Sequence, residues 1–253
     1  MAISLSTVII ARNEEKNIEA CIHSAKQVSD DIILIDSGSK DNTIALAKAL
    51  GARTYEYGWH GYGANKNFGN EQAKNDWILS IDGDEVLSDA LIQSLLHLHP
   101  DNNTVYQVNS IVNYRGKWIK HSGWHPKWKH RVFHRKEVKW NDALVHEDLE
   151  PLVDKTIARI KGDILHYSYT SIEEHKEKAL EYAQLKARQW INKGSKPSMV
   201  KFIFGPSFNF LKTYVFQRGI LDGEEGWTIA KMNAYMTRQQ LRTYSELKTG
   251  NSK

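Results

Sequence analysis

Short apolar runs separated by amphipathic stretches dominate the first hundred residues. Three runs are wholly or almost wholly apolar, at residues 7–10, 32–35 and 77–81. Such runs are typical of strands that are buried on both faces of a parallel sheet. Apolar positions at helical spacing predict helices at residues 18–25, 41–50, 64–73 and 88–99. This alternation predicts an α/β fold with a doubly wound, mostly parallel sheet and helices on both faces.

The pattern changes in the middle of the chain and again near its end. Residues 104–169 are rich in Trp, His, Tyr and Val, and we expect short strands and loops there. Helical periodicity returns at residue 171, is broken at 194–197, and continues in two further stretches. We therefore expect an α/β domain over residues 1–170 and a C-terminal helical region over residues 171–253.

Composition excludes several classes of protein. The single cysteine, Cys21, excludes an internal disulfide and a cysteine-based zinc site. The 34 basic residues nearly balance the 30 acidic ones, so charge gives no reason to expect nucleic acid as a partner. The N-terminus does not resemble a signal peptide, and no run reaches the ~18 apolar residues of a membrane span. We expect a cytoplasmic protein and leave open a peripheral contact with the inner face of the cell membrane.

Acidic residues follow two of the predicted strands. Asp36 ends the second apolar run and Asp82 ends the third, with Asp84 two positions further on. Because parallel strands end at one edge of a sheet, Asp36 and Asp82 should face one pocket. Paired carboxylates suit Mg²⁺ or Mn²⁺ shared with substrate phosphates. An Asp-Gly-Asp motif is more often only a turn with a helix cap, but its place after a buried strand favours the metal site.

Other nucleotide and metal motifs fit less well. No dinucleotide-binding glycine motif is present, because Lys66 stands where its last glycine would be, and no phosphate-binding loop occurs. Lys66 could meet a diphosphate, but a solvated helix lysine is an equal alternative. The histidine pairs at 121–125 and 130–134 have helical zinc-ligand spacing, yet Gly123 and Pro126 interrupt the first and the second lies in a predicted strand.

The ordered motifs of the first ninety residues resemble the family 2 glycosyltransferases, which have a GT-A fold. The resemblance is carried by residues 7–18, 36–43 and 77–85. Later segments resemble one branch, the bacterial lipopolysaccharide-core β-glucosyltransferases, at residues 131–134, 145–147 and 217–226. Asp-Gly-Asp replaces the branch's commoner Asp-Ala-Asp, and His134 stands where arginine is frequent.

The resemblance implies a role for individual residues of a nucleotide-sugar-binding, catalytic domain. Asp36 would accept a hydrogen bond from uracil, Lys66 would approach the ribose or diphosphate, and Asp82 and Asp84 would form the metal-binding motif. Glu147 would be the general base, with Asp148 as the alternative. Ala11, Arg12 and Glu14 would line the nucleotide site. We also expect Arg218 at the donor site, where Arg218 and Asp222 would close over the donor or the acceptor pocket.

We therefore expect an inverting, metal-dependent hexosyltransferase that uses a UDP-sugar, most simply UDP-glucose, and a lipopolysaccharide-core or similar glycolipid or oligosaccharide acceptor. The alternatives are a polyprenyl phosphate or peptide acceptor, a sugar nucleotidyltransferase, and a non-catalytic carbohydrate-binding module. The aromatic and basic segment from about Met199 to Tyr244 either docks on a membrane surface or packs on the protein core. Partial docking of this segment on a membrane would be consistent with both predictions.

Overall fold

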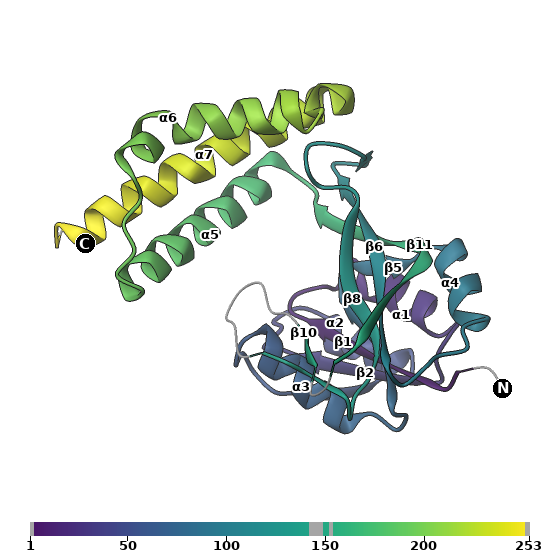
Figure 1. The fold of residues 1–253 in the computed structure, drawn as a ribbon. Helices are drawn as coiled ribbons and strands as arrows, with labels where there is room; N and C mark the ends of the chain where they lie inside the picture. Colours follow the sequence, from purple (N-terminus) through teal and green to yellow (C-terminus); the bar gives the residue numbers. More distant parts are fainter. Residues whose placement is uncertain (1–2, 142–148, 152–153, 251–253) are drawn as a thin grey trace. The chain divides into compact units, whose positions relative to one another are not determined.

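The computed structural model describes residues 3–141, 149–151 and 154–250 (Figure 1). The chain divides into two compact units. Unit 1 comprises Met1–Ile111 and Lys127–Tyr167, and unit 2 comprises Val112–Pro126 and Ser168–Lys253. Residues 112–126 are therefore grouped with the C-terminal helices, although they precede the boundary expected at residue 170. The functional division at that boundary stays a prediction.

Four parallel strands form one half of the sheet of unit 1, in the order β3-β2-β1-β4. They are β1 (Leu5–Ala11), β2 (Asp31–Asp36), β3 (Arg53–Glu56) and β4 (Trp77–Asp82). Helices connect them in sequence: α1 (Ile18–Ala25), α2 (Thr43–Ala49) and α3 (Tyr62–Gln72). The three predicted strands and their helices are present, and the α/β class with a GT-A-type sheet is confirmed.

Antiparallel strands extend the sheet beyond β4, in the order β4-β8-β6-β11-β5. They are β5 (Glu85–Leu87), β6 (Thr104–Tyr114), β8 (Lys127–His134) and β11 (Thr156–Tyr169), and α4 (Asp89–Leu96) follows β5. A separate two-stranded sheet joins β9 (Val138–Trp140) and β10 (Leu149–Pro151). The expectation of only short strands here was wrong, because β6 has 11 residues and β11 has 14.

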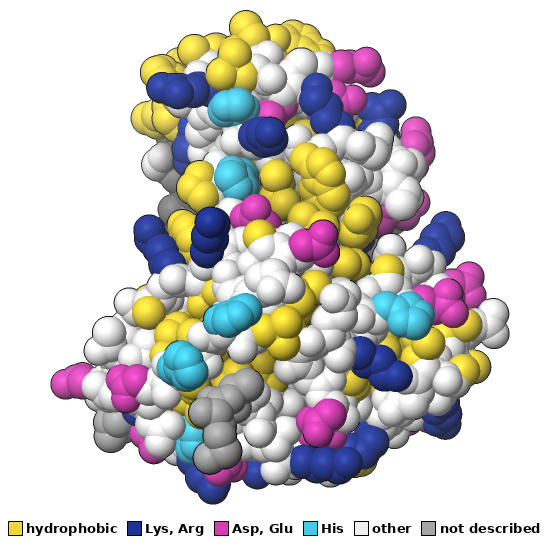
Figure 2. All heavy atoms as spheres, turned by 90° about the vertical axis from the view of Figure 1, so that its right-hand side faces the viewer, with side chains coloured by type: hydrophobic (Ala, Val, Ile, Leu, Met, Phe, Trp, Pro, Cys, Tyr) yellow, Lys and Arg dark blue, Asp and Glu magenta, His cyan; other side chains and the backbone are white. Residues whose placement is uncertain are grey.

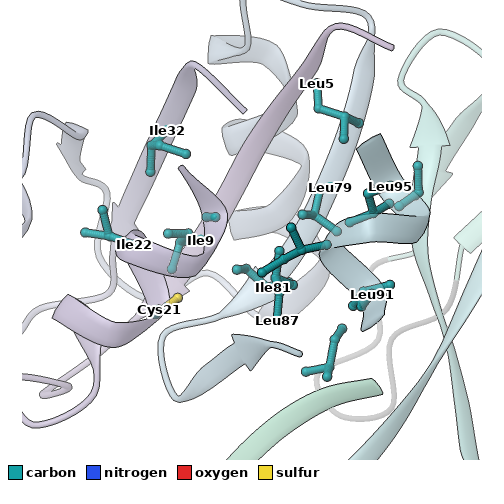
Figure 3. Packing of buried hydrophobic residues seen from close by; sticks show 14 of the residues in the cluster. Leu5, Ile9, Cys21, Ile22, Ile32, Leu79, Ile81, Leu87, Leu91 and Leu95 are labelled. Carbon is teal, nitrogen blue, oxygen red and sulfur yellow. The ribbon is translucent and has the colours of Figure 1, made fainter. Parts of the chain in front are cut away.

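Hydrophobic side chains cover both faces of the parallel strands. On β1, Leu5, Ile9 and Ala11 point into a core that also contains Cys21 of α1 and Leu91 of α4 (Figure 3). The alternate residues Val8 and Ile10 belong to a second core on the opposite face, against which Phe68 of α3 packs. Side chains of a strand alternate between its faces, so a strand covered on both faces is apolar throughout.

Unit 2 is mainly helical. Its elements are β7 (Lys117–Ile119), α5 (Ile172–Asn192), α6 (Met199–Leu211), the π-helical turn η1 (Lys212–Phe216), the 3₁₀ turn η2 (Gly219–Asp222) and α7 (Gly223–Lys248). α7 packs against both α5 and α6: the ring of Tyr244 lies 6.1 Å from that of Trp190 and 6.4 Å from that of Phe202. Within the described residues, no helix is both long enough and apolar enough to cross a membrane.

Candidate active site

The register of β1 places Asp36 and Asp82 at the same edge of the sheet. Ala11 at the end of β1 pairs with Asp36 of β2, and Ile10 pairs with Asp82 of β4. The turn after β4 lies against the end of β1, because a side-chain carbon built at Gly83 would be 2.9 Å from Cβ of Ala11. The two carboxylates therefore lie at one edge of the sheet, as expected, and that they face one pocket stays a prediction.

The segments that follow β1 and β2 are tied together by hydrogen bonds. The backbone N–H of Asn13 donates to the hydroxyl of Ser39 at 2.8 Å, and that of Glu14 donates to the hydroxyl of Thr43 at 2.7 Å. Ala11 is buried and Arg12 is exposed. These bonds hold the region predicted to line the nucleotide site in one arrangement.

Asp36 shapes the turn that follows β2. Its Oδ2 accepts hydrogen bonds from the backbone N–H groups of Gly38 and Ser39, each at 2.8 Å, and the residue is only 1% exposed. The hydroxyl of Ser39 donates to Oδ1. These contacts explain why an acidic residue ends this strand, and the contact of Asp36 with uracil stays a prediction.

Positive charges surround the carboxylate of Asp82. Its Oδ1 lies 3.7 Å from Nζ of Lys66, and its Oδ2 lies 3.3 Å from Nη2 of Arg131. Burial by itself would raise the pKa of Asp82, but the charges of Lys66, Arg131 and Lys129 outweigh it and hold the pKa well below its usual value. Asp82 is therefore ionised at every pH at which the protein is expected to work.

A fully buried carboxylate, Glu85, stands behind Asp82. Its Oε1 pairs with Nη2 of Arg131 at 2.5 Å and with Nζ of Lys129 at 3.2 Å. Its Oε2 accepts the backbone N–H of Asp82 at 3.0 Å. Burial opposes the charged form, but Arg131 and Lys129 lower the pKa of Glu85 below its usual value. Glu85 thus fixes both the backbone of Asp82 and the arginine that neutralises it.

Asp84 has a histidine partner on β11. Nε2 of His166 lies 3.0 Å from Oδ2 of Asp84, and the backbone N–H of Tyr167 donates to the carbonyl of Asp84 at 2.9 Å. Burial would lower the pKa of His166, but the negative charge of Asp84 outweighs it, and the pKa lies above its usual value. Both side chains are partly exposed, at 17% for Asp84 and 22% for His166, so solvent reaches the pair.

Lys66 of α3 is a buried residue with an aromatic partner. It is 2% exposed, and its Nζ lies 4.6 Å from the centre of the Trp140 ring. A solvated helix lysine was one of the two sequence interpretations, and the burial of Lys66 contradicts it. A buried ammonium beside Asp82 is a fixed positive charge at the carboxyl edge of the sheet.

Comparison with known proteins identifies the family. The chain matches the model for glycosyl transferase family 2 over residues 6–153. An uncharacterized glycosyltransferase of Rickettsia typhi is 30% identical over 256 residues, covering 96% of this chain and 87% of that protein. The lipopolysaccharide core biosynthesis glycosyltransferase LpsC of Rhizobium meliloti is 31% identical over 85% of this chain and 82% of its own. This chain belongs to glycosyltransferase family 2.

A solved structure of glucosyl-3-phosphoglycerate synthase from Mycobacterium tuberculosis, in complex with Mn²⁺, UDP and glucosyl-3-phosphoglycerate, matches part of this glycosyltransferase. It is 28% identical over 44% of each chain, with a TM-score of 0.35. The family assignment itself rests on the sequence matches. Membership of family 2 confirms the resemblance seen in the motifs. It excludes a nucleotidyltransferase and a non-catalytic carbohydrate-binding module as descriptions of this protein.

The remaining predicted site residues of the glycosyltransferase lie elsewhere. Glu147 and Asp148 fall outside the described residues, so their role stays a prediction. Arg218 belongs to unit 2, is exposed and has a left-handed backbone, with φ of 56°. Its neighbour Asp222 is buried and accepts hydrogen bonds from Lys120 N and Ser122 Oγ at 3.1 and 2.7 Å. Asp222 therefore holds the chain within unit 2, and the contact of Arg218 with the donor stays a prediction.

The sequence interpretation of the glycosyltransferase missed four charged residues of the site: Glu85, Lys129, Arg131 and His166. Glu85 carried a signal, as the third acid within four residues. Arg131 begins one of the segments that resemble the lipopolysaccharide-core branch, but nothing in the sequence placed it beside Asp82. Lys129 and His166 carried no signal. All three reach Asp82 or Asp84 only through the pairing of β8 with β4 and of β11 with β5. Among the described residues, no three His, Cys, Asp or Glu side chains are placed to hold a metal ion.

Proposed function

We propose that this family 2 glycosyltransferase moves a hexose, most simply glucose, from a UDP-sugar to a lipopolysaccharide-core or similar glycolipid acceptor with inversion at the anomeric carbon. One observation supports the proposed UDP-sugar donor. The ionised Asp82, the side chain of Asp84 and the buried ammonium of Lys66 gather at the carboxyl edge of the parallel sheet. Ligands of open α/β sheets bind outside this edge.

The donor set at Asp84 fits a divalent cation. Asp84 provides carboxylate oxygen and His166 provides an imidazole nitrogen that is 3.0 Å away, and both are reached by solvent. We assign direct metal contact to Asp84 and His166, because the charge of Asp82 is already balanced by Lys66 and Arg131. Asp82 would then contact the ribose or the ligand shell of the metal. A bound Mg²⁺ or Mn²⁺ would neutralise charge on the diphosphate.

Lys66 suits the departure of the nucleoside diphosphate. Its ammonium is held in place by Asp82 and by the Trp140 ring, so no reorganisation is needed as negative charge develops on the leaving oxygen. The acceptor hydroxyl needs a carboxylate base to take its proton as it attacks. We propose Glu147 for this role, with Asp148 as the alternative. Attack on the face opposite the diphosphate inverts the anomeric carbon.

The glycolipid acceptor is proposed from the relative LpsC, whose name places it in lipopolysaccharide core biosynthesis. A polyprenyl phosphate or a peptide remains the second acceptor class. A screen of UDP-glucose, UDP-galactose and UDP-N-acetylglucosamine by UDP release, with and without Mn²⁺, tests the donor. Mass analysis of an elongated lipid-oligosaccharide tests the acceptor, and transfer only to a polyprenyl phosphate or peptide contradicts it.

Replacement of Asp84 tests the metal assignment. Asp84→Ala should lower turnover at least ~10²-fold and abolish the response to Mn²⁺, since the variant loses a charged ligand. Asp89→Ala is the matched control, because Asp89 is an exposed acid five positions further along the chain. Circular dichroism checks that both variants fold. Near-normal turnover of Asp84→Ala with unchanged Mn²⁺ dependence contradicts the assignment.

Replacement of Glu147 tests the general base. Glu147→Gln keeps the shape of the side chain and removes its basicity, so kcat should fall at least ~10²-fold. Asp148→Asn should retain most of the activity, and exposed Glu150 provides a further control as Glu150→Gln. If Asp148→Asn is the inactive variant, the two roles are exchanged.

A further inference from the structure

One side of α6 and the turns after it is uncovered and apolar. Ten hydrophobic residues are each at least 49% exposed: Met199, Val200, Ile203, Phe204, Phe208, Leu211, Val215, Phe216, Ile220 and Leu221. We call these ten residues the apolar face. α6 has no buried residue, although it is the most hydrophobic of the described helices. Exposed apolar surface of this extent marks a site of interaction.

The spacing of the residues separates two sides of α6. Val200, Phe204, Phe208 and Leu211 recur every three or four residues and form one exposed stripe. The opposite side packs on α7, where the ring of Phe210 lies 4.9 Å from that of Trp227. For α6, the prediction that the aromatic segment packs on the protein is therefore correct only for the side that faces α7. The outer side has no partner among the described residues of unit 2.

The segment that carries the apolar face is positively charged in sequence, and the acidic residues Asp222, Glu224 and Glu225 follow it only at the start of α7. Residues 182–221 contain seven Lys or Arg and no Asp or Glu, whereas the whole chain has 34 basic and 30 acidic residues. Lys201 and Lys212 follow Val200 and Leu211 directly, which places them along one border of the stripe. Figure 2 shows hydrophobic side chains gathered at the top of the molecule, where Figure 1 draws α6, with Lys and Arg and also Asp and Glu side chains beside them.

We propose that the apolar face docks on a bilayer that contains anionic phospholipid. Apolar side chains bordered by Lys and Arg bind such a surface by burial below the headgroups together with attraction to the phosphates. Two copies of this chain are a poorer fit, since pairing the face with itself would bring like charges together. The inference rests on the proposed function in one respect: a glycolipid acceptor would be presented to the enzyme at that bilayer.

Vesicle sedimentation of the full chain tests the proposal without any donor or acceptor. We expect binding to vesicles of equimolar phosphatidylcholine and phosphatidylglycerol, little binding to phosphatidylcholine alone, and weaker binding as NaCl is raised. Phe204→Ser/Phe208→Ser should weaken binding at least about tenfold, because two aromatic side chains no longer enter the bilayer. Lys201→Glu/Lys212→Glu should weaken it by about fivefold or more for each lysine.

Matched controls separate these effects from general changes in charge and hydrophobicity. Ile157→Ser removes an equally exposed apolar residue of β11, and Lys48→Glu/Lys139→Glu makes the same change in net charge on exposed lysines of unit 1. Both controls should bind anionic vesicles as the native chain does. Absence of vesicle binding, or binding that Phe204→Ser/Phe208→Ser retains, overturns the proposal, as does a dimer in solution that only this variant dissociates.

The same variants keep this proposal distinct from the proposed function. UDP release from the soluble UDP-sugar should be unchanged in Phe204→Ser/Phe208→Ser, since Asp82, Asp84 and Lys66 all belong to unit 1 and neither phenylalanine is a predicted donor contact. Loss of vesicle binding with intact UDP release supports membrane docking. A native chain that binds anionic vesicles but releases no UDP from any UDP-sugar contradicts the proposed activity alone.

Discussion

Replacing Arg131 by methionine should be among the most destabilising single changes in unit 1. Arg131 is 2% exposed, and its guanidinium pairs with the fully buried Glu85 and with Asp82, and donates to the carbonyl of Ser80 at 3.0 Å. Methionine retains most of the apolar stem but removes the charge. The variant therefore leaves a buried carboxylate without its principal counter-charge.

The expected cost follows from the burial of the pair. Removing one partner of a buried ion pair costs about 3–5 kcal/mol of unfolding free energy. Lys129 remains 3.2 Å from Glu85, so we expect the lower end, about 3 kcal/mol. Adding Glu85→Gln removes the orphaned charge, and the double variant should be more stable than the sum of the two single effects by about 1–3 kcal/mol.

Urea unfolding followed by tryptophan fluorescence measures these differences. Lys136→Met is the matched control: Lys136 pairs with Asp76 at 2.8 Å but is 65% exposed, so its loss should cost about 0–1 kcal/mol. In Arg131→Met we expect the pKa of Glu85 to rise, because burial then acts against a smaller attraction from the remaining positive charges. The difference in unfolding free energy between the native protein and Arg131→Met should therefore shrink as pH falls and Glu85 is protonated.

The reasoning is refuted if Arg131→Met costs no more than Lys136→Met. It is also refuted if the deficit of Arg131→Met grows rather than shrinks between neutral and acidic pH. Turnover gives an independent readout, because Glu85 and Arg131 position Asp82. The Arg131→Met protein, measured below its unfolding transition, should turn over UDP-sugar more slowly than Lys136→Met.

Two further predictions concern stability. His175 of α5 is buried, and burial followed by repulsion from Lys178 lowers its pKa to about 4. The imidazole titrates near pH 6.5 in the unfolded chain. The contribution of neutral His175 to the unfolding free energy is therefore fully present above that pH and is lost as pH falls towards 4. The unfolding free energy should drop by about 2 kcal/mol between about pH 7.5 and 5, and His175→Phe should remove this part of the slope. A side-chain carbon at Gly69 of α3 would overlap Val8 and lie 3.0 Å from Ile35, so Gly69→Ala should cost about 1–3 kcal/mol by urea unfolding. Gly205→Ala, which meets nothing closer than 3.4 Å, should be neutral or stabilising, and an equal loss in both variants would contradict the packing argument.

The parallel half of the sheet could be predicted from the sequence because its signals are local. A strand buried on both faces is a continuous apolar run, and a helix on a sheet has its apolar residues at fixed spacing. The position of Asp36 and Asp82 at one edge could also be predicted from the sequence. Strands that are joined by helices run parallel and end on the same side of the sheet. The family motifs lie on these same strand ends, which is why the resemblance and the pattern agreed.

The antiparallel half could not be predicted in the same way. β6 and β11 carry polar residues on one side and cross a bulge or a glycine, so their hydrophobic pattern is interrupted and resembles several short strands. Arg131 is 46 positions from Glu85, and His166 is 82 positions from Asp84. Only the strand pairing of the folded chain brings these charges together.

The sequence by itself determined the α/β class, the family and the two carboxylates at the edge of the sheet. The tertiary structure alone decided how those carboxylates are held. It buried Lys66 beside Asp82, placed Glu85 and Arg131 behind that residue, and set His166 against Asp84. It also decided which side of α6 is covered by α7 and which side is left exposed. The physical reason is the same in each case. Periodicity and composition describe what one segment prefers, whereas burial and charge pairing depend on which distant segments fold against it.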